Sequence, residues 1–448
     1  MFLFQILIGL AWMLFWPLVR YENAADCTGG KPDACTILIG SGHESTANLA
    51  IDYFNRGVDW GRQGRDDQAI ADYTRATEIN PELAQAYQNR GFVYAKQGRF
   101  DEAIADATKA IALRPNFAPG YTNRSYAYQG KGLSDAAIAD ASKAITLQSD
   151  YVQAWWDRGN AYNAKGQRDE AIADFTKAIA LKPDFVAAYE VRGGVYAAKS
   201  MHDEAIADYT KVITLRPDFA AGYYNRGISL EQKGLYDEAI ADDNEAIALK
   251  PDYAAAYNNR GFALTRKNRN DEAIADFTEA IALNPKDVHA YGNRGAAYER
   301  ISRYDEAIAD FTVVIARNPT STAGYYGRGI GYAKKGQRDE AIADYTKAIA
   351  IDPNFAKAYN NRAWTYHLMG DDAKGLPDAE KAVALAPTEA NCFGTRAAIY
   401  EELGQTDKAI VDYRTALRLD PDHQPAVDGL QRLEVTPRAV APIAPASH

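Results

Sequence analysis

The side chains best suited to chemistry are few in this sequence and lie far apart. Its 448 residues include only three cysteines and six histidines. A catalytic centre needs a nucleophile, a base and an orienting group within hydrogen-bond reach, and no motif in the sequence places such a set together. We therefore predict that the chain is not an enzyme, and that it uses no cofactor and no metal ion.

Cys27 and Cys35 are the one close pair, eight positions apart. An oxidising compartment would favour a disulfide bond between them. Two free thiols are the next alternative, and a metal site is the last, because only His43 is nearby. Cys392 stands alone and is predicted to be a packed small residue.

An arginine and an aspartate that lie sixteen residues apart recur eleven times, at intervals of 34 residues. A catalytic pair would not be repeated eleven times. We predict instead a partly buried ion pair that joins two helices within each repeat, for example Arg90 with Asp106 and Arg226 with Asp242.

The same interval of 34 residues recurs in the segments that must position these ion pairs. Proline recurs at this spacing from Pro81 to Pro421, with Ser149 at the one place where it is missing. Eleven repeats therefore run without insertion from Ala50 to His423. We number the positions within each repeat from 1 to 34, so that the recurring proline is at position 32.

Each repeat has the periodicity of two α-helices. Aromatic or small residues at positions 4, 8 and 11 share one face of a first helix, and those at positions 20, 24 and 27 share one face of a second. A glycine such as Gly98, at position 15, permits the turn between them, and the proline ends the second helix. Asn or Asp at position 33, as at Asp184 and Asn354, is predicted to cap the next helix.

This spacing resembles the tetratricopeptide repeat family over about four-fifths of the chain. The resemblance implies an all-α fold, a right-handed superhelical solenoid of eleven helix–turn–helix repeats whose first helices line a concave groove. It also implies binding to other proteins or peptides. One departure is Asp243, which stands at position 24, where an aromatic residue is usual.

The resemblance places positions 5, 6 and 9 on the groove. Asparagine is frequent at position 6 in repeats 1–3 and 6–8, and resembles the asparagine ladder of O-linked N-acetylglucosamine transferases. An amide can bind a peptide backbone through both donor and acceptor, although repeat duplication alone could have copied it. Aromatic residues at positions 5 and 9 suit extended or helical peptides, or else pack between neighbouring first helices. The candidate binding residues are Asn55, Asn89, Asn123, Asn225, Asn259, Asn293, Asn361, Phe92, Trp156, Tyr224, Phe262 and Trp364.

The segments outside the repeats have compositions of their own. Residues 1–20 are predicted to be a transmembrane anchor or a signal segment, because only Gln5 is polar between Phe2 and Val19. A misassigned start codon or a buried helix would also account for this apolar run. Residues 21–49 are predicted to be a linker with a short helix and the cysteine pair, residues 424–433 a capping helix, and residues 434–448 a disordered tail.

The predicted function is a protein–protein interaction scaffold that binds peptide segments in its groove. The alternative is a cell-envelope assembly factor that binds glycan or lipoprotein ligands. The 60 acidic and 50 basic side chains include no basic run, which argues against a nucleic-acid partner. The cysteine pair and the apolar N-terminus resemble those of exported or membrane-anchored bacterial tetratricopeptide proteins, which implies an array on the periplasmic or extracytoplasmic side.

Overall fold

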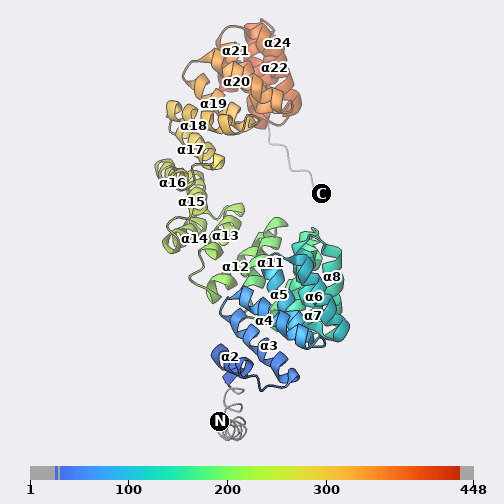
Figure 1. Cartoon of the computed structure of the whole chain (residues 1–448). Helices are drawn as coiled ribbons and strands as arrows, with labels where there is room; N and C mark the ends of the chain where they lie inside the picture. The colour runs from blue at the N-terminus through green and yellow to red at the C-terminus, as the bar shows by residue number, and fades with distance from the viewer. Residues whose placement is uncertain (1–25, 29–30, 434–448) are drawn as a thin grey trace, which may run out of the picture. The chain divides into compact units, whose positions relative to one another are not determined.

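The computed structural model describes residues 26–28 and 31–433, which form α-helices joined by short turns (Figure 1). No β-strand occurs among these residues, and the predicted all-α repeat solenoid is confirmed. None of the helices in the described part of the chain is both long and apolar enough to cross a membrane. The predicted anchor or signal at residues 1–20 and the predicted tail at residues 434–448 lie outside the described residues.

The chain divides into two compact units after Pro217. The first unit contains α2 (Pro32–Ser41) and the helix pairs of repeats 1–5. These pairs are α3 (Thr46–Arg62) with α4 (Asp66–Ile79), α5 (Ala84–Lys96) with α6 (Phe100–Leu113), α7 (Ala118–Gly130) with α8 (Ser134–Leu147), α9 (Val152–Ala164) with α10 (Arg168–Leu181), and α11 (Val186–Ala198) with α12 (His202–Leu215).

The second unit contains the helix pairs of repeats 6–11 and a closing helix, α25 (Gln424–Arg432). The pairs are α13 (Ala220–Gln232) with α14 (Tyr236–Leu249), α15 (Ala254–Arg266) with α16 (Asn270–Leu283), α17 (Val288–Arg300) with α18 (Tyr304–Arg317), α19 (Thr322–Lys334) with α20 (Arg338–Ile351), α21 (Ala356–Leu368) with α22 (Asp372–Leu385), and α23 (Ala390–Glu402) with α24 (Thr406–Leu419).

A left-handed residue at position 15 turns the first helix of every repeat into the second. Eight repeats have glycine there, and Ser200, Asn268 and Ser302 take the same conformation with φ of 59°, 60° and 62°. Because a side chain is disfavoured in this region, the packing of the flanking helices must hold these three residues in it.

Small residues at position 8 let the two helices of a repeat approach closely. A Cβ atom added at Gly159 would lie 2.7 Å from the ring of Phe175, a fully buried residue at position 24 of the same repeat. The core of each repeat is therefore an aromatic or small side chain of the second helix seated against the backbone of the first.

The predicted capping by position 33 is wrong. The first helices begin one residue later than that prediction requires, so that α11 follows Phe185 and α21 follows Phe355, and neither residue makes a side-chain capping bond. The position before these helices is instead used for packing, since the ring of Phe185 lies 5.1 Å from that of Trp156. The N-cap is therefore position 34, and where this residue is polar, as at Asp287 and Ser321, its side chain caps the helix.

Candidate functional site

The predicted ion pair between first and second helix is present in all eleven repeats. In repeat 2, Arg90 donates from Nε and Nη2 to the two carboxylate oxygens of Asp106 at 2.7 and 2.8 Å. The other ten pairs have the same two-bond arrangement, with distances of 2.6–2.9 Å. Both groups lie mostly out of solvent, so the pair is part of the framework.

The arginine also binds the preceding repeat, a contact that was not predicted from the sequence. Arg90 Nη1 donates to Thr74 Oγ1 at 3.0 Å, and the equivalent nitrogen in repeats 3–5 and 7–10 donates to the side-chain oxygen at position 25 of the repeat before. The recurrence of Thr or Ser at position 25 is the sequence signal that could have revealed it. Each of these arginines therefore joins three helices.

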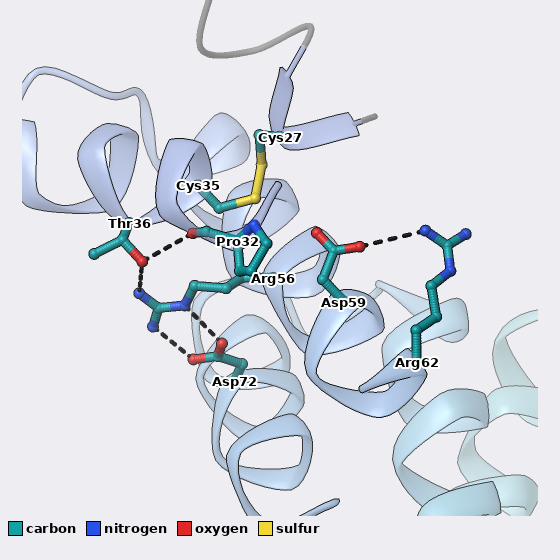
Figure 2. The surroundings of a disulfide bond; sticks show 8 residues. All are labelled: Cys27, Pro32, Cys35, Thr36, Arg56, Asp59, Arg62 and Asp72. Carbon is teal, nitrogen blue, oxygen red and sulfur yellow. Dashed lines mark hydrogen bonds and ion pairs between the residues drawn. A yellow bond between two sulfur atoms is a disulfide. The ribbon is translucent and has the colours of Figure 1, made fainter. Parts of the chain in front are cut away.

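At the N-terminal end, α2 takes the place of a preceding repeat. Arg56 Nη1 donates to Thr36 Oγ1 of α2 at 3.1 Å, while its other nitrogens bind Asp72 (Figure 2). A disulfide bond joins Cys27 to Cys35, and both sulfurs are buried with Leu38 of the same helix. The cysteine pair thus fixes the segment before α2 to the helix that begins the array.

Four of the candidate asparagines at position 6 already bind the preceding repeat. The amide nitrogens of Asn123, Asn259, Asn293 and Asn361 donate at 2.8–3.2 Å to Gln88 O, Asp243 Oδ2, Asn258 Oδ1 and Tyr326 Oη respectively. All seven candidate asparagines are half-buried. In each of these four bonds one N–H of the amide is used, and the carbonyl oxygen of Asn361 also accepts from Asn360 Nδ2 at 3.5 Å. The binding role of the seven asparagines stays a prediction.

The aromatic candidates separate into two classes. Trp156 and Tyr224, at position 5, pack inside the wall, with ring centroids 5.4 Å from Phe175 and 5.0 Å from Tyr253. The candidates at position 9 reach solvent: Phe92 is 51% exposed, Phe262 41% and Trp364 40%. The second class is therefore the more exposed one, although the Trp364 ring also packs 4.9 Å from that of His367.

In the second unit, a pocket of about 1040 Å³ extends over α19, α21, α23 and α25. It brings together two sequence candidates, Asn361 and Trp364; the other ten candidates do not line it. Its aromatic lining comes from Tyr326, Phe355, Trp364 and Tyr413, and its polar lining includes Lys357, Asn360, Asn361, His367, Glu389, Asn391, Glu401, Glu402, His423, Asp428 and Arg432.

Repeat 11 contributes three small residues to the lining of the pocket. Positions 5, 6 and 9 of that repeat are Gly394, Thr395 and Ala398, and all three line the pocket. His423 seals the end of this hollow, because a Cβ atom at Gly394 would lie 2.5 Å from its ring. The small residues at these three positions are the sequence signal, and it was not used in the prediction.

Hydrogen bonds fix the charged groups of the pocket. Arg432 donates to both carboxylate oxygens of Glu401 at 2.9 Å and lowers the pKa of that carboxyl group, with further help from the Tyr413 hydroxyl at 2.6 Å. Burial lowers the pKa of His423, so its imidazole is neutral at pH 7. His367 Nδ1 lies 2.7 Å from Asp372 Oδ1. These contacts fix the positions of Glu401, Arg432 and His367 in the wall of the pocket.

Three buried carboxyl groups elsewhere have pKa values raised to about 8. Burial raises the pKa of Asp157 in the first unit to about 8, despite a hydrogen bond from Gln153. In the second unit, burial raises the pKa of Asp243 and that of Glu231 to about 8, and the charge of Glu231 contributes to the shift of Asp243. All three are therefore largely protonated at pH 7 and form no anionic site.

Repeat-family models match most of the chain. A model described as a TPR repeat matches residues 62–98, 159–200, 193–234, 232–267 and 331–370. Models described as tetratricopeptide repeats match residues 84–117, 118–151, 258–322, 356–389 and 390–423. The chain belongs to the tetratricopeptide repeat family. No curated protein matches this tetratricopeptide repeat chain in sequence.

Solved structures similar to this tetratricopeptide repeat chain share the fold type at modest scores. The APC/C hetero-tetramer Cut9–Hcn1 is 13% identical, with a TM-score of 0.48, and the match covers 89% of this chain and 94% of that one. Yeast Tom70 is 17% identical, with a TM-score of 0.40, over 87% and 96% of the two chains. YrrB, described as a TPR protein with an unusual peptide-binding site, is 26% identical, with a TM-score of 0.36, over 41% and 95%.

Proposed function

We propose that this protein is an interaction scaffold that holds a segment of a partner protein in the pocket of repeats 9–11. The observation that carries the proposal is the pocket itself, where the exposed ring of Trp364 stands beside the amides of Asn360, Asn361 and Asn391. Apolar rings supply binding energy, and amides orient a peptide backbone by hydrogen bonds.

The size and shape of the pocket favour a polypeptide over a small molecule. Its volume of about 1040 Å³ lies at the upper end of the range for small-molecule sites, roughly 300–1,000 Å³. The pocket also crosses α19, α21, α23 and α25, and each of these helices contacts the next one. A ligand that fills it must be elongated, as an extended or helical segment is.

We also infer that the array lies in an oxidising, extracytoplasmic compartment, as the sequence predicts. The disulfide bond between Cys27 and Cys35 supports this location, because such bonds persist outside the reducing cytoplasm. Attachment to a membrane through residues 1–20 belongs to the same proposal.

Photo-crosslinking in cells tests the proposed function. A photoreactive residue at Ala398, which lines the pocket, is compared with one at Val411, which is 61% exposed on the outer helix α24. We expect a defined protein to be captured from Ala398 and not from Val411. Equal capture from both positions would refute the pocket as the binding site, and capture of envelope glycan or lipoprotein from Ala398 would favour the alternative function.

A further inference from the structure

The chain leaves the array at the edge of the pocket. Arg432, the last residue of α25, lines the pocket and binds Glu401. Residues 434–448 follow directly after Leu433. The chain segment that directly follows the pocket-lining residues is therefore 434–448.

The pocket has an apolar floor and an acidic rim. Trp364 and Leu368 lie one helical turn apart on α21 and are 40% and 48% exposed, which extends the apolar surface beyond the pocket. Three exposed carboxylates line the pocket, and within the described residues none of them forms an ion pair. These carboxylates are Glu389, Glu402 and Asp428, and they outnumber Lys357, the exposed lysine on the same lining.

Residues 435–448 combine apolar side chains with one positive charge, which complements the pocket. After Glu434 the segment has no acid, and Arg438 is its only arginine or lysine. Val435, Val440 and Ile443 are its largest aliphatic side chains, and Pro437, Pro442 and Pro445 restrict its backbone. Restricted φ angles reduce the entropy that is lost when a segment binds in an extended form.

The length of the segment is sufficient. Fifteen residues, 434–448, span up to about 50 Å when extended. Adjacent packed helices are about 10 Å apart, so the path from α25 across α23 and α21 to α19 is about 30 Å. The segment can therefore cross the whole pocket without displacing α25.

We propose that residues 434–448 occupy the pocket of repeats 9–11 in cis and compete there with a partner segment. Arg438 lies against the carboxylates of the rim, and Val440 and Ile443 pack against Trp364 and its neighbours. Covalent connection gives the segment an effective concentration near the millimolar range, so that even weak contacts hold it in place until a tighter partner arrives. This inference rests on the proposed function, because it concerns the regulation of the same pocket.

A photoreactive residue at Ile443 of the full chain tests the location. We expect intramolecular crosslinks to peptides that contain Trp364 or Ala398. The same group placed at Val411 is the matched control, and it should not crosslink to those peptides. Crosslinks from Ile443 that are intermolecular, or that fall outside α19–α25, would overturn the proposal; intermolecular crosslinks would indicate that a second copy is the occupant.

Competition tests the regulation. The probe is a synthetic peptide of residues 434–448, titrated against the full chain and against a full-chain variant with Arg438→Glu and Ile443→Asp. We expect the variant to bind the probe at least 10-fold more tightly, because its own segment has left the pocket. Adding Trp364→Ala should remove that binding, whereas Phe92→Ala, at the same repeat position in the first unit, should not.

The two proposals fail in different ways. Equal binding of the probe by the full chain and the variant would overturn the inference about residues 434–448. If partner capture from Ala398 then persists, the proposed function still holds. If that capture also fails, both proposals are wrong.

Discussion

Repeats 6 and 9 share the arginine–aspartate ion pair but have different kinds of residue in their interiors. Arg226 binds Asp242 and Arg328 binds Asp344 in the same two-bond geometry. At position 24, however, repeat 9 has Tyr345, a buried ring that packs against Gly329, whereas repeat 6 has Asp243 with no exposed surface at all. One repeat fills its centre with an aromatic ring, and the other fills it with a carboxyl group.

The difference teaches which positions set the fold and which are free for function. The arginine–aspartate pair keeps the two helices in register whatever lies at position 24. In repeat 9 the ring of Tyr326 lies 6.0 Å from that of Tyr345 and 4.8 Å from that of Phe355. Tyr326 and Phe355 also form one wall of the pocket. In repeat 6 the interior carries protonated acids and makes stability depend on pH.

The largest expected effect comes from removing the shared framework. Arg226→Ala and Arg328→Ala should each lower the free energy of unfolding by about 3 kcal/mol, because each leaves a buried aspartate without its cation. Urea unfolding followed by circular dichroism measures this loss. Arg338→Ala removes an exposed arginine of repeat 9 and should change stability by less than about 0.5 kcal/mol. Markedly unequal losses at Arg226 and Arg328 would contradict a common framework.

The interior of repeat 6 should make stability fall as pH rises. The pKa of Asp243 is raised to about 8 in the folded protein and is about 4 in the unfolded chain, so the unfolded chain releases its proton first. The contribution of this group to the free energy of unfolding is therefore fully present below pH 4. It declines between pH 4 and 8 and is absent above pH 8. Asp243→Asn should reduce this slope, leaving the part that comes from Glu231 and Asp157, and should raise stability at pH 8.5 by about 2 kcal/mol.

Measuring unfolding between pH 5 and 9 checks this dependence. Glu245→Gln, at an exposed position of the same helix, is the control and should leave the slope unchanged. A loss of stability from Asp243→Asn at pH 8.5 would contradict this prediction, because it would show that the carboxyl group is ionised and paired with a cation.

Asp157 should show the same behaviour more weakly. Seven repeats have asparagine at position 6, where repeat 4 has Asp157, and the residue has no second buried acid comparable to Glu231 among the causes of its shift. Asp157→Asn keeps the acceptor for Gln153 and should raise stability at pH 8.5 by about 1 kcal/mol. An equal gain at pH 5 would show that something other than ionisation is responsible, and thermal unfolding at the two pH values decides it.

The sequence predicts the framework because every framework residue repeats. The arginines at position 7, the aspartates at position 23 and the turn at position 15 are visible as a period of 34 residues, and their roles follow from helix geometry. The third contact of the arginine, as from Arg90 to Thr74, was not foreseen because it joins residues of different repeats. Position 33 was misread because the first helices begin one residue later, which makes position 34 the N-cap, as at Asp287 and Ser321.

The pocket was only partly predictable, because it depends on differences between repeats. Trp156 and Trp364 are both candidate aromatics in sequence, but a ring at position 5 meets Phe175 and Phe185, whereas a ring at position 9 meets solvent. Small residues such as Gly394 and Ala398 also line the pocket, and no search for reactive residues detects them.

The most direct test of the account compares two exposed aromatic residues at the same repeat position. The partner captured from Ala398 is titrated against the full chain and against Trp364→Ala and Phe92→Ala. The account predicts that Trp364→Ala weakens binding at least 10-fold, about 1.4 kcal/mol, and that Phe92→Ala changes it less than 2-fold. Equal losses from the two substitutions, or a loss confined to Phe92→Ala, would contradict the assignment of the binding site to repeats 9–11.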